Sequence, residues 1–240
     1  MKFCILIPAH NEKDSLEPTV RNIRRAFDRA GLEHHVLIVN DNSSDGTRDV
    51  AEQLVKGDLR VSVFHRAPPA GVGLAIRDGL SRMVGDAVII AMADASDDPE
   101  DMIVYAKKLE DGYDCVFGSR FIKGSRVENY PFHKLILNRL ANRFIQVMFL
   151  TRFNDITNAF KAYRREVIEA VQPLVSKRFN ITVEIPLKAL IRGRRISSVP
   201  IRWYGRTIGT SKLIIKEMGS RYLFVLFYVW LEKHLLKGDY

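Results

Sequence analysis

Three short polar segments in the N-terminal part of the chain hold the side chains best suited to chemistry. They are 8–12, 40–47 and 93–98, and each directly follows an apolar run. If those runs are parallel strands, their carboxyl ends meet at one edge of a sheet, and the three segments share one crevice. Each segment alone also suits an ordinary turn or helix cap. Three of them after successive strands favour a ligand site.

The third segment indicates the kind of ligand. Asp94, Asp97 and Asp98 lie close together in a chain whose formal net charge is +9. Mg²⁺ or Mn²⁺ suits such oxygen ligands and usually bridges them to substrate phosphates. The chain has no Gly-rich Walker loop, and Gly71-Val72-Gly73 lacks the third glycine of the dinucleotide fingerprint. Neither an ATPase nor a dehydrogenase is indicated.

The charge is divided unevenly. Residues 1–120 hold 15 Lys and Arg against 20 Asp and Glu, whereas residues 121–240 hold 22 against 8. A uniformly basic surface would indicate nucleic-acid binding. An acidic half and a basic half indicate two different tasks, and we expect no nucleic-acid partner. A basic nucleic-acid-binding module is the distant alternative, which a salt-dependent shift with DNA or RNA would support.

Strand and helix patterns alternate through the first half. Buried strands are expected at 3–7, 36–39, 61–64, 87–92 and 115–117, with helices between the first two strands and at 47–54, 74–83 and 99–109. Pro99 suits a first helical turn and Asp98 an N-cap. This order predicts an α/β protein with a doubly wound, mostly parallel sheet.

The second half is less regular. Helices are expected at 131–150, 165–175 and 183–191, and a strand at 196–203. We expect one catalytic domain over 1–212, divided at about residue 120 into a regular and a less regular part, and a helical extension over 213–240. Cys4 and Cys115 lie in apolar runs, which predicts buried thiols in a reducing compartment. The first apolar run is too short for a signal peptide.

The motifs together resemble a known family. They are Ile7-Pro8-Ala9-His10-Asn11-Glu12, Val39 through Thr47, Asp94 with Pro99-Glu100, Gly118-Ser119-Arg120, and Arg206 with Gly209-Thr210-Ser211-Lys212-Leu213. Over about residues 3–213 the chain is similar to family 2 glycosyltransferases of the GT-A fold, and most of all to the dolichol-phosphate (polyprenol-phosphate) mannose synthase group. The resemblance implies a Rossmann-like GT-A sheet and inverting transfer of a hexose from a nucleotide diphosphate-sugar.

The resemblance also implies roles for individual residues. It implies a donor-binding part up to about residue 120 and an acceptor-binding part over 121–212. The residues implied to bind the donor nucleotide are Pro8, His10, Glu12, Val39, Asp41, Ala93 and Asp94. The family usually has Asp-x-Asp, but the first position here is Met92, whose thioether is a weak ligand for a hard ion. Two residues after the second Asp, where the family sometimes has Gln, this chain has Ser96. Metal binding is therefore expected to rest on Asp94, Ser96 and Asp97 together with the donor phosphates.

The acceptor phosphate is implied to contact Arg120, Lys134, Asn138, Arg206 and Lys212, and the catalytic set is Asp94, Arg120, Lys134 and Arg206. Asp155 either supports this site or caps a turn, and Glu184 is either an acceptor-site residue or a paired structural charge. A phosphate monoester with a second pKa of about 6 is already an anion and needs orientation rather than a strong base. A hydroxyl acceptor would need one, with Asp97 or Asp98 as the candidate.

GDP-mannose is the favoured donor and a polyprenyl phosphate the favoured acceptor, with a UDP-sugar and a glycan or small hydroxyl acceptor as the alternative. A nucleotidyltransferase is less favoured, because 8–12 is not a Gly-rich basic loop.

The C-terminal segment suggests a place for the enzyme. The apolar run 222–231 would be about 15 Å long as a helix, against roughly 30 Å of hydrocarbon. Its cationic and aromatic flanks suit a helix lying on an anionic membrane. We therefore expect a cytoplasmic protein, peripheral on the inner face of the membrane. The alternatives are that this helix docks on the core, on a second copy in a homodimer or on a membrane subunit.

Overall fold

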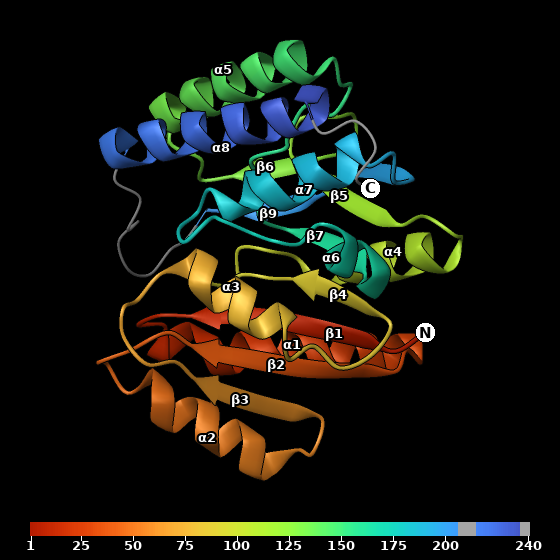
Figure 1. Cartoon of the computed structure of the whole chain (residues 1–240). Coiled ribbons are helices and arrows are strands. Elements are labelled where there is room, and N and C mark those ends of the chain that lie inside the picture. Colours follow the sequence, from red (N-terminus) through yellow and green to blue (C-terminus); the bar gives the residue numbers. More distant parts are fainter. Residues whose placement is uncertain (206–214, 236–240) are drawn as a thin grey trace.

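The computed structural model describes residues 1–205 and 215–235, and the structural statements below concern these residues. Seven strands form the central sheet in the order β3-β2-β1-β4-β7-β5-β8 (Figure 1). Their bounds are β1 Phe3–Ala9, β2 His34–Asn40, β3 Val61–His65, β4 Ala87–Ile90, β5 Cys115–Ser119, β7 Lys161–Arg164 and β8 Ile196–Pro200. A second, two-stranded sheet pairs β6 (Arg126–Glu128) with β9 (Arg202–Tyr204).

The sheet is parallel except at β7, which runs antiparallel to both β4 and β5. The predicted α/β class with a mostly parallel sheet is thus confirmed. The register of the parallel strands brings Ala9 of β1 opposite Asn40 of β2 and Leu6 opposite Ile90 of β4. The three polar segments therefore leave the sheet at the same edge, as the strand-end rule requires.

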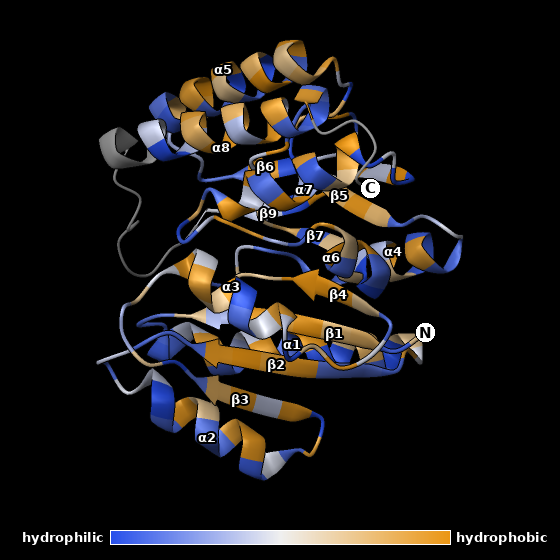
Figure 2. Cartoon of the chain, viewed as in Figure 1, coloured by the Kyte–Doolittle hydropathy of each residue, from blue (hydrophilic) through white to orange (hydrophobic). Residues whose placement is uncertain are grey.

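The helices cover both faces of the sheet. Their bounds are α1 Lys13–Ala30, α2 Thr47–Gly57, α3 Val72–Leu80, α4 Pro99–Glu110, α5 Phe132–Phe149, α6 Arg165–Ala170, α7 Ile181–Ile191 and α8 Ile215–Leu235. α1, α2 and α4 contribute to one apolar cluster, and α3, α6 and α7 to the other, joined by buried residues of α5 and α8. The hydropathy colouring shows the apolar strands between these layers (Figure 2).

Alternation along each strand divides the core. In β1, Phe3 and Ile5 pack in one cluster, whereas Cys4 and Leu6 pack in the other. Both cysteines are buried and unpaired, as predicted, and burial raises the pKa of the Cys4 thiol to about 11. The predicted N-cap is also confirmed, because the Asp98 side chain accepts a hydrogen bond from the Glu100 amide at 2.9 Å.

Several expected elements differ from the structure. The helix expected over 165–175 ends at Ala170, and the chain then passes through Pro173, which has no amide hydrogen for a helical bond. The strand expected over 196–203 is two strands, β8 and β9, because the chain changes partner at Ile201: its amide donates to Ser119 of β5, whereas its carbonyl accepts from the Arg126 amide of β6. β4 ends at Ile90 rather than at 92, and β6 and β7 were not predicted.

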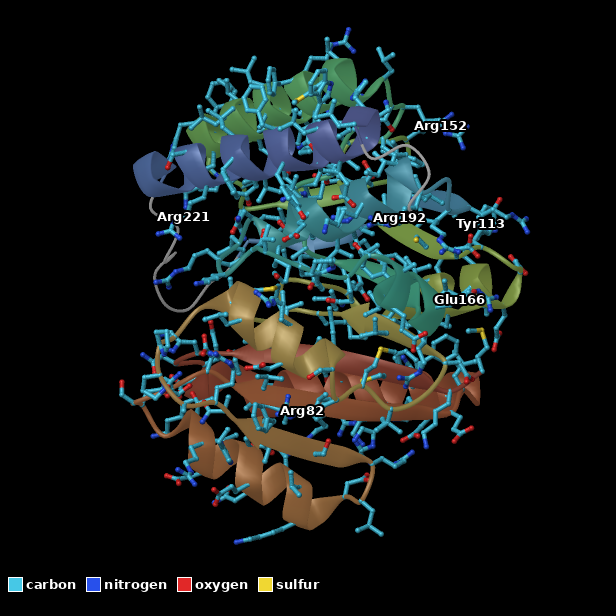
Figure 3. The ribbon with its side chains drawn as sticks, viewed as in Figure 1. Arg82, Tyr113, Arg152, Glu166, Arg192 and Arg221 are labelled. Carbon is cyan, nitrogen blue, oxygen red and sulfur yellow. The ribbon has the colours of Figure 1, made fainter. Side chains whose placement is uncertain are left out.

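The C-terminal helix α8 packs on the protein. Its buried residues Val225, Leu226 and Val229 join the core cluster that includes α7. Arg192, at the end of α7 (Figure 3), pairs with Glu232 of α8 at 2.6 Å. Among the described residues, no helix is both long and apolar enough to span a bilayer. The expected start of the extension, 213–214, lies outside the described residues.

Candidate active site

Hydrogen bonds join the loops that follow β1 and β2. The His10 ring nitrogen Nδ1 lies 2.6 Å from the Asp41 carbonyl oxygen, and the Glu12 amide donates to the Thr47 hydroxyl at 2.8 Å. Asn11 is held at both ends, because its amide donates to the Ser43 hydroxyl and its side-chain oxygen accepts from the Ser44 amide. Two of the three predicted segments therefore form one connected structure.

One non-glycine residue in each of the three loops has a left-handed backbone. The φ angles are 55° at Asn11, 57° at Asn42 and 58° at Ala95. Asparagine tolerates this region because its short polar side chain bonds locally, whereas alanine there costs roughly 1–2 kcal/mol. Such strain persists where the surrounding structure enforces it, and it is concentrated at functional sites. The segment 93–98 after β4, which we call the aspartate loop, is therefore the strained one.

Asp41 is bound more tightly than the sequence indicated. One of its carboxylate oxygens accepts from the Gly71 amide at 2.6 Å, and the other accepts from Arg66. Arg66 also binds Asp78 of α3, so one buried guanidinium links the β2 loop to α3. Burial opposes the charge on Arg66, but its hydrogen bonds to Asp78 and Asp41 outweigh this and raise its pKa. Sequence patterns gave no signal for Arg66.

Three of the expected donor contacts have buried apolar side chains. Pro8 and Val39 lie inside β1 and β2, and Ala93 is buried at the start of the aspartate loop. Any contact they make with a nucleotide would therefore be through their backbone atoms. His10 and Glu12 are half-buried at the loop surface.

The aspartate loop is held from both sides. The Thr19 hydroxyl of α1 donates to the Ala93 carbonyl at 3.2 Å, and the Tyr204 amide of β9 donates to the Ser96 carbonyl at 3.0 Å. Half-buried Asp94 accepts from the Ser96 amide at 3.1 Å, which turns the loop tightly around this carboxylate. Ser96 itself is buried.

Asp97 lies beneath the loop. Its carboxylate accepts from the Met92 amide at 3.0 Å, so it stabilises the backbone of the residue that replaces the family's first aspartate. Burial, with the nearby charge of Asp94, raises the pKa of Asp97 to about 7, and Arg120 acts in the opposite direction. Among the described residues, no three His, Cys, Asp or Glu side chains are grouped as metal ligands.

Arg120 follows β5 and is almost fully enclosed. Its side chain is 8% exposed, and it binds Asp155 through Nη2 to Oδ1 at 2.7 Å and through Nε to Oδ2 at 2.8 Å. The guanidinium carbon lies 5.4 Å from the Tyr130 ring centre and 5.8 Å from that of Trp203. Burial opposes its charge, but Asp155 more than compensates and raises the pKa of Arg120. Asp155 is therefore paired with a predicted acceptor-site residue, which favours the first of its two predicted roles.

Asn138 joins α5 to the same loop. Its side-chain amide donates to the Thr157 hydroxyl at 2.9 Å, two residues after Asp155. Lys134 precedes Asn138 by four residues and lies on the same half-buried face of α5. Among the described residues, the Lys134 ammonium group has no ion-pair partner. The structure thus brings Arg120, Asn138 and Lys134 to one region, whereas Arg206 and Lys212 lie outside the described residues.

The chain also matches known proteins. Residues 4–172 match the model of glycosyl transferase family 2. A polyprenol monophosphomannose synthase from Mycolicibacterium smegmatis is 33% identical over 215 residues, which cover 87% of this chain and 80% of the relative. The chain belongs to glycosyl transferase family 2.

Two further comparisons place this glycosyltransferase among its relatives. A dolichol-phosphate mannosyltransferase from Pyrococcus furiosus is 32% identical over 218 residues, covering 89% of this chain and 59% of the relative. A glucosyl-3-phosphoglycerate synthase from Mycobacterium tuberculosis, solved with Mn²⁺, UDP and phosphoglyceric acid, superposes with a TM-score of 0.71. It covers 97% of this chain and 78% of its own at 17% identity, which shows a shared fold.

Lys161 is a residue of this glycosyltransferase that sequence reasoning missed. It lies in β7, fully buried, and its ammonium group donates to the Ile156 carbonyl at 2.9 Å and to the Asn158 carbonyl. These bonds hold the loop that carries Asp155 and Thr157. Burial lowers the pKa of Lys161 to about 7, which Asp155 partly opposes.

Glu184 has a structural role. Its side chain is completely buried and accepts from the amides of Val175 and Ser176 at 2.8 Å each, with Lys188 at 3.6 Å. Of the two predicted roles for Glu184, the structure therefore supports the paired structural charge.

Proposed function

We propose that this glycosyltransferase moves a hexose, with mannose favoured, from a nucleotide diphosphate-sugar to a polyprenyl phosphate, with inversion at the anomeric carbon. The observation that carries the proposal is that β9 joins the aspartate loop to the basic region: its Tyr204 amide donates to the Ser96 carbonyl at 3.0 Å, and its Trp203 ring centre lies 5.8 Å from the Arg120 guanidinium carbon. A donor diphosphate and an acceptor phosphate would therefore meet between these loops. The names of the two mannosyl-transferring relatives support the substrate class.

The donor nucleotide is proposed to bind the joined loops after β1 and β2. Because Asp41 already accepts from Arg66 and Gly71, its remaining acceptor capacity would be limited to lone pairs pointing outward. The His10 ring lies beside it, with Nδ1 2.6 Å from the Asp41 carbonyl oxygen, and the Glu12 amide is bonded to Thr47 at the end of the same loop. GDP is favoured over UDP on the strength of the mannosyltransferase relatives, whereas the structural neighbour was solved with UDP.

The aspartate loop fits a divalent cation. Asp94 supplies a hard oxygen ligand at the end of β4, while the Asp97 carboxylate is used by the Met92 amide and the Met92 thioether is a poor ligand. Asp94, with Ser96 and Asp97 nearby, would hold Mg²⁺ or Mn²⁺ alongside oxygens of the donor diphosphate. The chemistry that a bound cation supplies is neutralisation of charge on the leaving diphosphate.

The protein groups explain how the transfer would proceed. An oxygen of the acceptor phosphate attacks the anomeric carbon, and the bond to the diphosphate breaks on the opposite side, so the electron pair leaves with the nucleoside diphosphate. Because the attacking oxygen is already anionic, Arg120, Lys134 and Asn138 need only orient it and balance its charge. Arg206 and Lys212 are proposed to add to this set.

We also propose that the protein works on the cytoplasmic face of an anionic membrane, where a polyprenyl phosphate would be embedded. The cationic and aromatic residues near the C-terminus support this placement. A homodimer or a membrane subunit is a further proposal that the same segment prompts.

The test is a transfer assay with the purified full-length protein. Labelled GDP-mannose and UDP-glucose are each offered with a polyprenyl phosphate in detergent or with phosphoglycerate and sugar hydroxyl acceptors, in Mn²⁺, Mg²⁺ or EDTA. We expect label in the lipid phosphate from GDP-mannose, dependence on the cation, and an inverted anomeric linkage by NMR. Label in a hydroxyl acceptor and none in the lipid would replace this proposal with the UDP-sugar alternative.

A further inference from the structure

α5 buries three side chains, and one of them is polar. Ile145 and Phe149 join the core cluster, whereas Asn142, which is 1% exposed, carries a side-chain amide into the same interior. A buried amide costs free energy unless its hydrogens and its oxygen are hydrogen-bonded. Neither the sequence motifs nor the proposed function gives Asn142 a role, so its partners indicate what it does.

Asn142 bonds to two residues with both ends of its amide. Its nitrogen Nδ2 donates to the Asn138 side-chain oxygen Oδ1 at 2.9 Å, to the Asn138 carbonyl at 3.0 Å and to the Thr157 hydroxyl at 2.9 Å. Its oxygen Oδ1 accepts from the Thr157 backbone amide at 3.3 Å. Two hydrogens are thus shared among three oxygens, and one side chain links a turn of α5 to the loop that follows Asp155.

Backbone groups fix the direction of the Asn142 amide. The Thr157 backbone N–H can only donate, so it must face the Asn142 oxygen, and the Asn138 carbonyl can only accept, so it must face the Asn142 nitrogen. Because Asn142 therefore presents hydrogens to the Asn138 side chain, Asn138 must answer with its oxygen. The Asn138 nitrogen is then left to donate to the Thr157 hydroxyl at 2.9 Å. The direction of one amide sets the direction of the next.

The groups predicted to meet the acceptor therefore present hydrogens. The Asn138 oxygen and one of its N–H groups are used, and its second N–H has no hydrogen-bond partner among the described residues. The Lys134 ammonium and Arg120 guanidinium groups carry donors and no acceptor. Both oxygens of the Asp155 carboxylate already accept from Arg120. An ionised phosphate has acceptors and suits this set, whereas a hydroxyl group also has a proton to donate and finds no free acceptor among these groups.

Other bonds hold the loop itself. The buried Lys161 ammonium group donates to two of its carbonyls, and the Thr182 hydroxyl donates to the Thr157 carbonyl at 3.4 Å. These bonds do not involve Asn142 and would remain if its side chain were replaced. What Asn142 determines is the direction of the Asn138 amide.

We propose that Asn142 is a positioning residue of the acceptor site, which fixes the Asn138 amide with an N–H toward the acceptor and thereby favours a phosphate over a hydroxyl acceptor. The preference for phosphate rests on the proposed function, whereas the fixed direction of the Asn138 amide does not. Asn142 acts through Asn138 and does not itself touch the substrate.

Separate Michaelis constants for donor and acceptor test this role in the full-length protein, with GDP-mannose and a short-chain polyprenyl phosphate. Asn142→Leu, which nearly keeps the shape of the side chain, should raise the KM for the phosphate acceptor at least about 10-fold, because a hydrogen bond to a charged group is lost. The KM for the donor should stay within about 2-fold of wild type. The matched control is Gln146→Leu, one turn further along α5, which removes an amide that donates to the Arg152 carbonyl at 3.3 Å. It should leave both constants unchanged.

A double-variant cycle separates positioning from general damage. Asn138→Ala should raise the acceptor KM by a similar factor, and adding Asn142→Leu to it should change that KM by less than about 2-fold, because Asn142 acts through the amide already removed. Polyprenol, which has a hydroxyl in place of the phosphate, should inhibit Asn142→Leu as well as it inhibits wild type. Effects that multiply in the double variant, or equal weakening of polyprenol and of the phosphate, would give Asn142 a role in the fold alone and overturn the inference.

Side-chain amide NMR tests the positioning without any substrate. In wild type, the Asn138 hydrogen bonded to Thr157 should exchange with solvent more slowly than the other, and Asn142→Leu should speed its exchange at least about 10-fold. Asn142→Asp keeps an oxygen for the Thr157 amide and removes the N–H groups, so it should act alike and serves if Asn142→Leu does not fold. Transfer to a hydroxyl acceptor alone, with exchange as described, would end the proposed function and still show that Asn142 fixes Asn138. Exchange at Asn138 that neither variant changes would overturn the inference.

Discussion

Because Met92 stands in place of the family's first aspartate, Asp94 is the remaining carboxylate of that pair, and we propose that cation binding rests mainly on it. Asp97 is nearby, but its oxygen is used by the Met92 amide. We therefore expect Asp94→Asn to lower transfer at least ~100-fold, the scale of removing a key electrostatic group from an active site. The measurement is the initial rate of transfer at saturating substrates, with the folded state checked by circular dichroism.

Asp111→Asn is the matched control, because this carboxylate is exposed at the end of α4. It should transfer as wild type does. If Asp94→Asn also kept near-normal turnover and EDTA left wild type unaffected, the assignment of Asp94 to a cation would be wrong.

Lys134 and Arg120 differ in how they are held. Arg120 is paired with Asp155, whereas Lys134 has no ion-pair partner among the described residues. We expect Lys134→Ala to raise the KM for the acceptor about 10-fold, with little change in the KM for the donor, since one charge-assisted bond to phosphate contributes about 1.5–3 kcal/mol. Lys56→Ala, an exposed lysine on α2, is the control. A rise confined to the donor KM would assign Lys134 to the diphosphate instead.

Lys161 makes stability depend on pH. Burial lowers its pKa to about 7, whereas an unfolded lysine has a pKa of about 10.4. Between these values the unfolded chain holds one more proton, so this residue makes the free energy of unfolding rise with pH by up to about 1.4 kcal/mol per unit. Below about pH 7 both states are protonated and the contribution is flat.

Lys161→Met should remove this part of the profile. Urea unfolding of wild type and variant at several pH values from about 6 to 9 gives a difference that must grow with pH above about 7. The comparison cancels the opposing effect of the buried Cys4 thiol, whose pKa is raised. Parallel profiles for the two proteins would show that Lys161 does not titrate in this range.

At the scale of elements, the sequence was informative where each strand or helix follows a regular pattern. β1 to β5 and α1 to α4 were predicted because their apolar runs and caps are continuous, and the first three polar loops followed from them. β7 was missed because Lys161–Arg164 contains two charged residues in four, one of them buried. Its antiparallel insertion between β4 and β5 is a tertiary property with no local pattern.

The site shows the same limit. Asp94 and Arg120 could be predicted because they belong to short motifs, and Asn138 because it matches a family position; the structure bonds Arg120 and Asn138 to the same loop. Arg66 and Lys161 could not, because each acts through partners 25 residues away or through backbone carbonyls. Long-range ion pairs and buried donors leave no periodic signal in the chain.

The C-terminal helix has two sides with opposite expected effects on stability. Val229 is completely buried in the core cluster, whereas Leu231, two residues later, is 45% exposed. We expect Val229→Asp to lower the free energy of unfolding by about 3 kcal/mol or more, because a carboxylate would be buried without a partner. Leu231→Asp should change it by less than about 0.5 kcal/mol. Equal, small effects in thermal or urea unfolding would mean that α8 is not packed as the structure shows.

At the scale of the whole molecule, the uneven charge matches the two substrates of the proposed reaction, the donor nucleotide and the acceptor phosphate. The acidic first half provides the loops at the carboxyl ends of β1, β2 and β4, and the basic second half provides α5, α8 and their cations. In the proposed function, a nucleotide approaching the first half would need a cation to offset its own charge there, whereas a phosphate on an anionic membrane would meet a surface that attracts it. Donor binding should therefore depend on a divalent cation.

Thermal shift measures this dependence directly, because a ligand that binds only the folded protein stabilises it by mass action. At about 100 times its Kd, a nucleoside diphosphate with Mn²⁺ should add about 2.7 kcal/mol and raise the Tm by roughly 5–10 °C for a chain of this size. GDP should act at lower concentration than UDP, and omission of Mn²⁺ should reduce the shift. In Asp94→Asn the shift should no longer depend on Mn²⁺, because the carboxylate that links cation to protein is gone. A wild-type protein whose Tm responds to neither diphosphate would contradict a donor site in these loops, and a shift that is equal with and without Mn²⁺ would place the cation elsewhere.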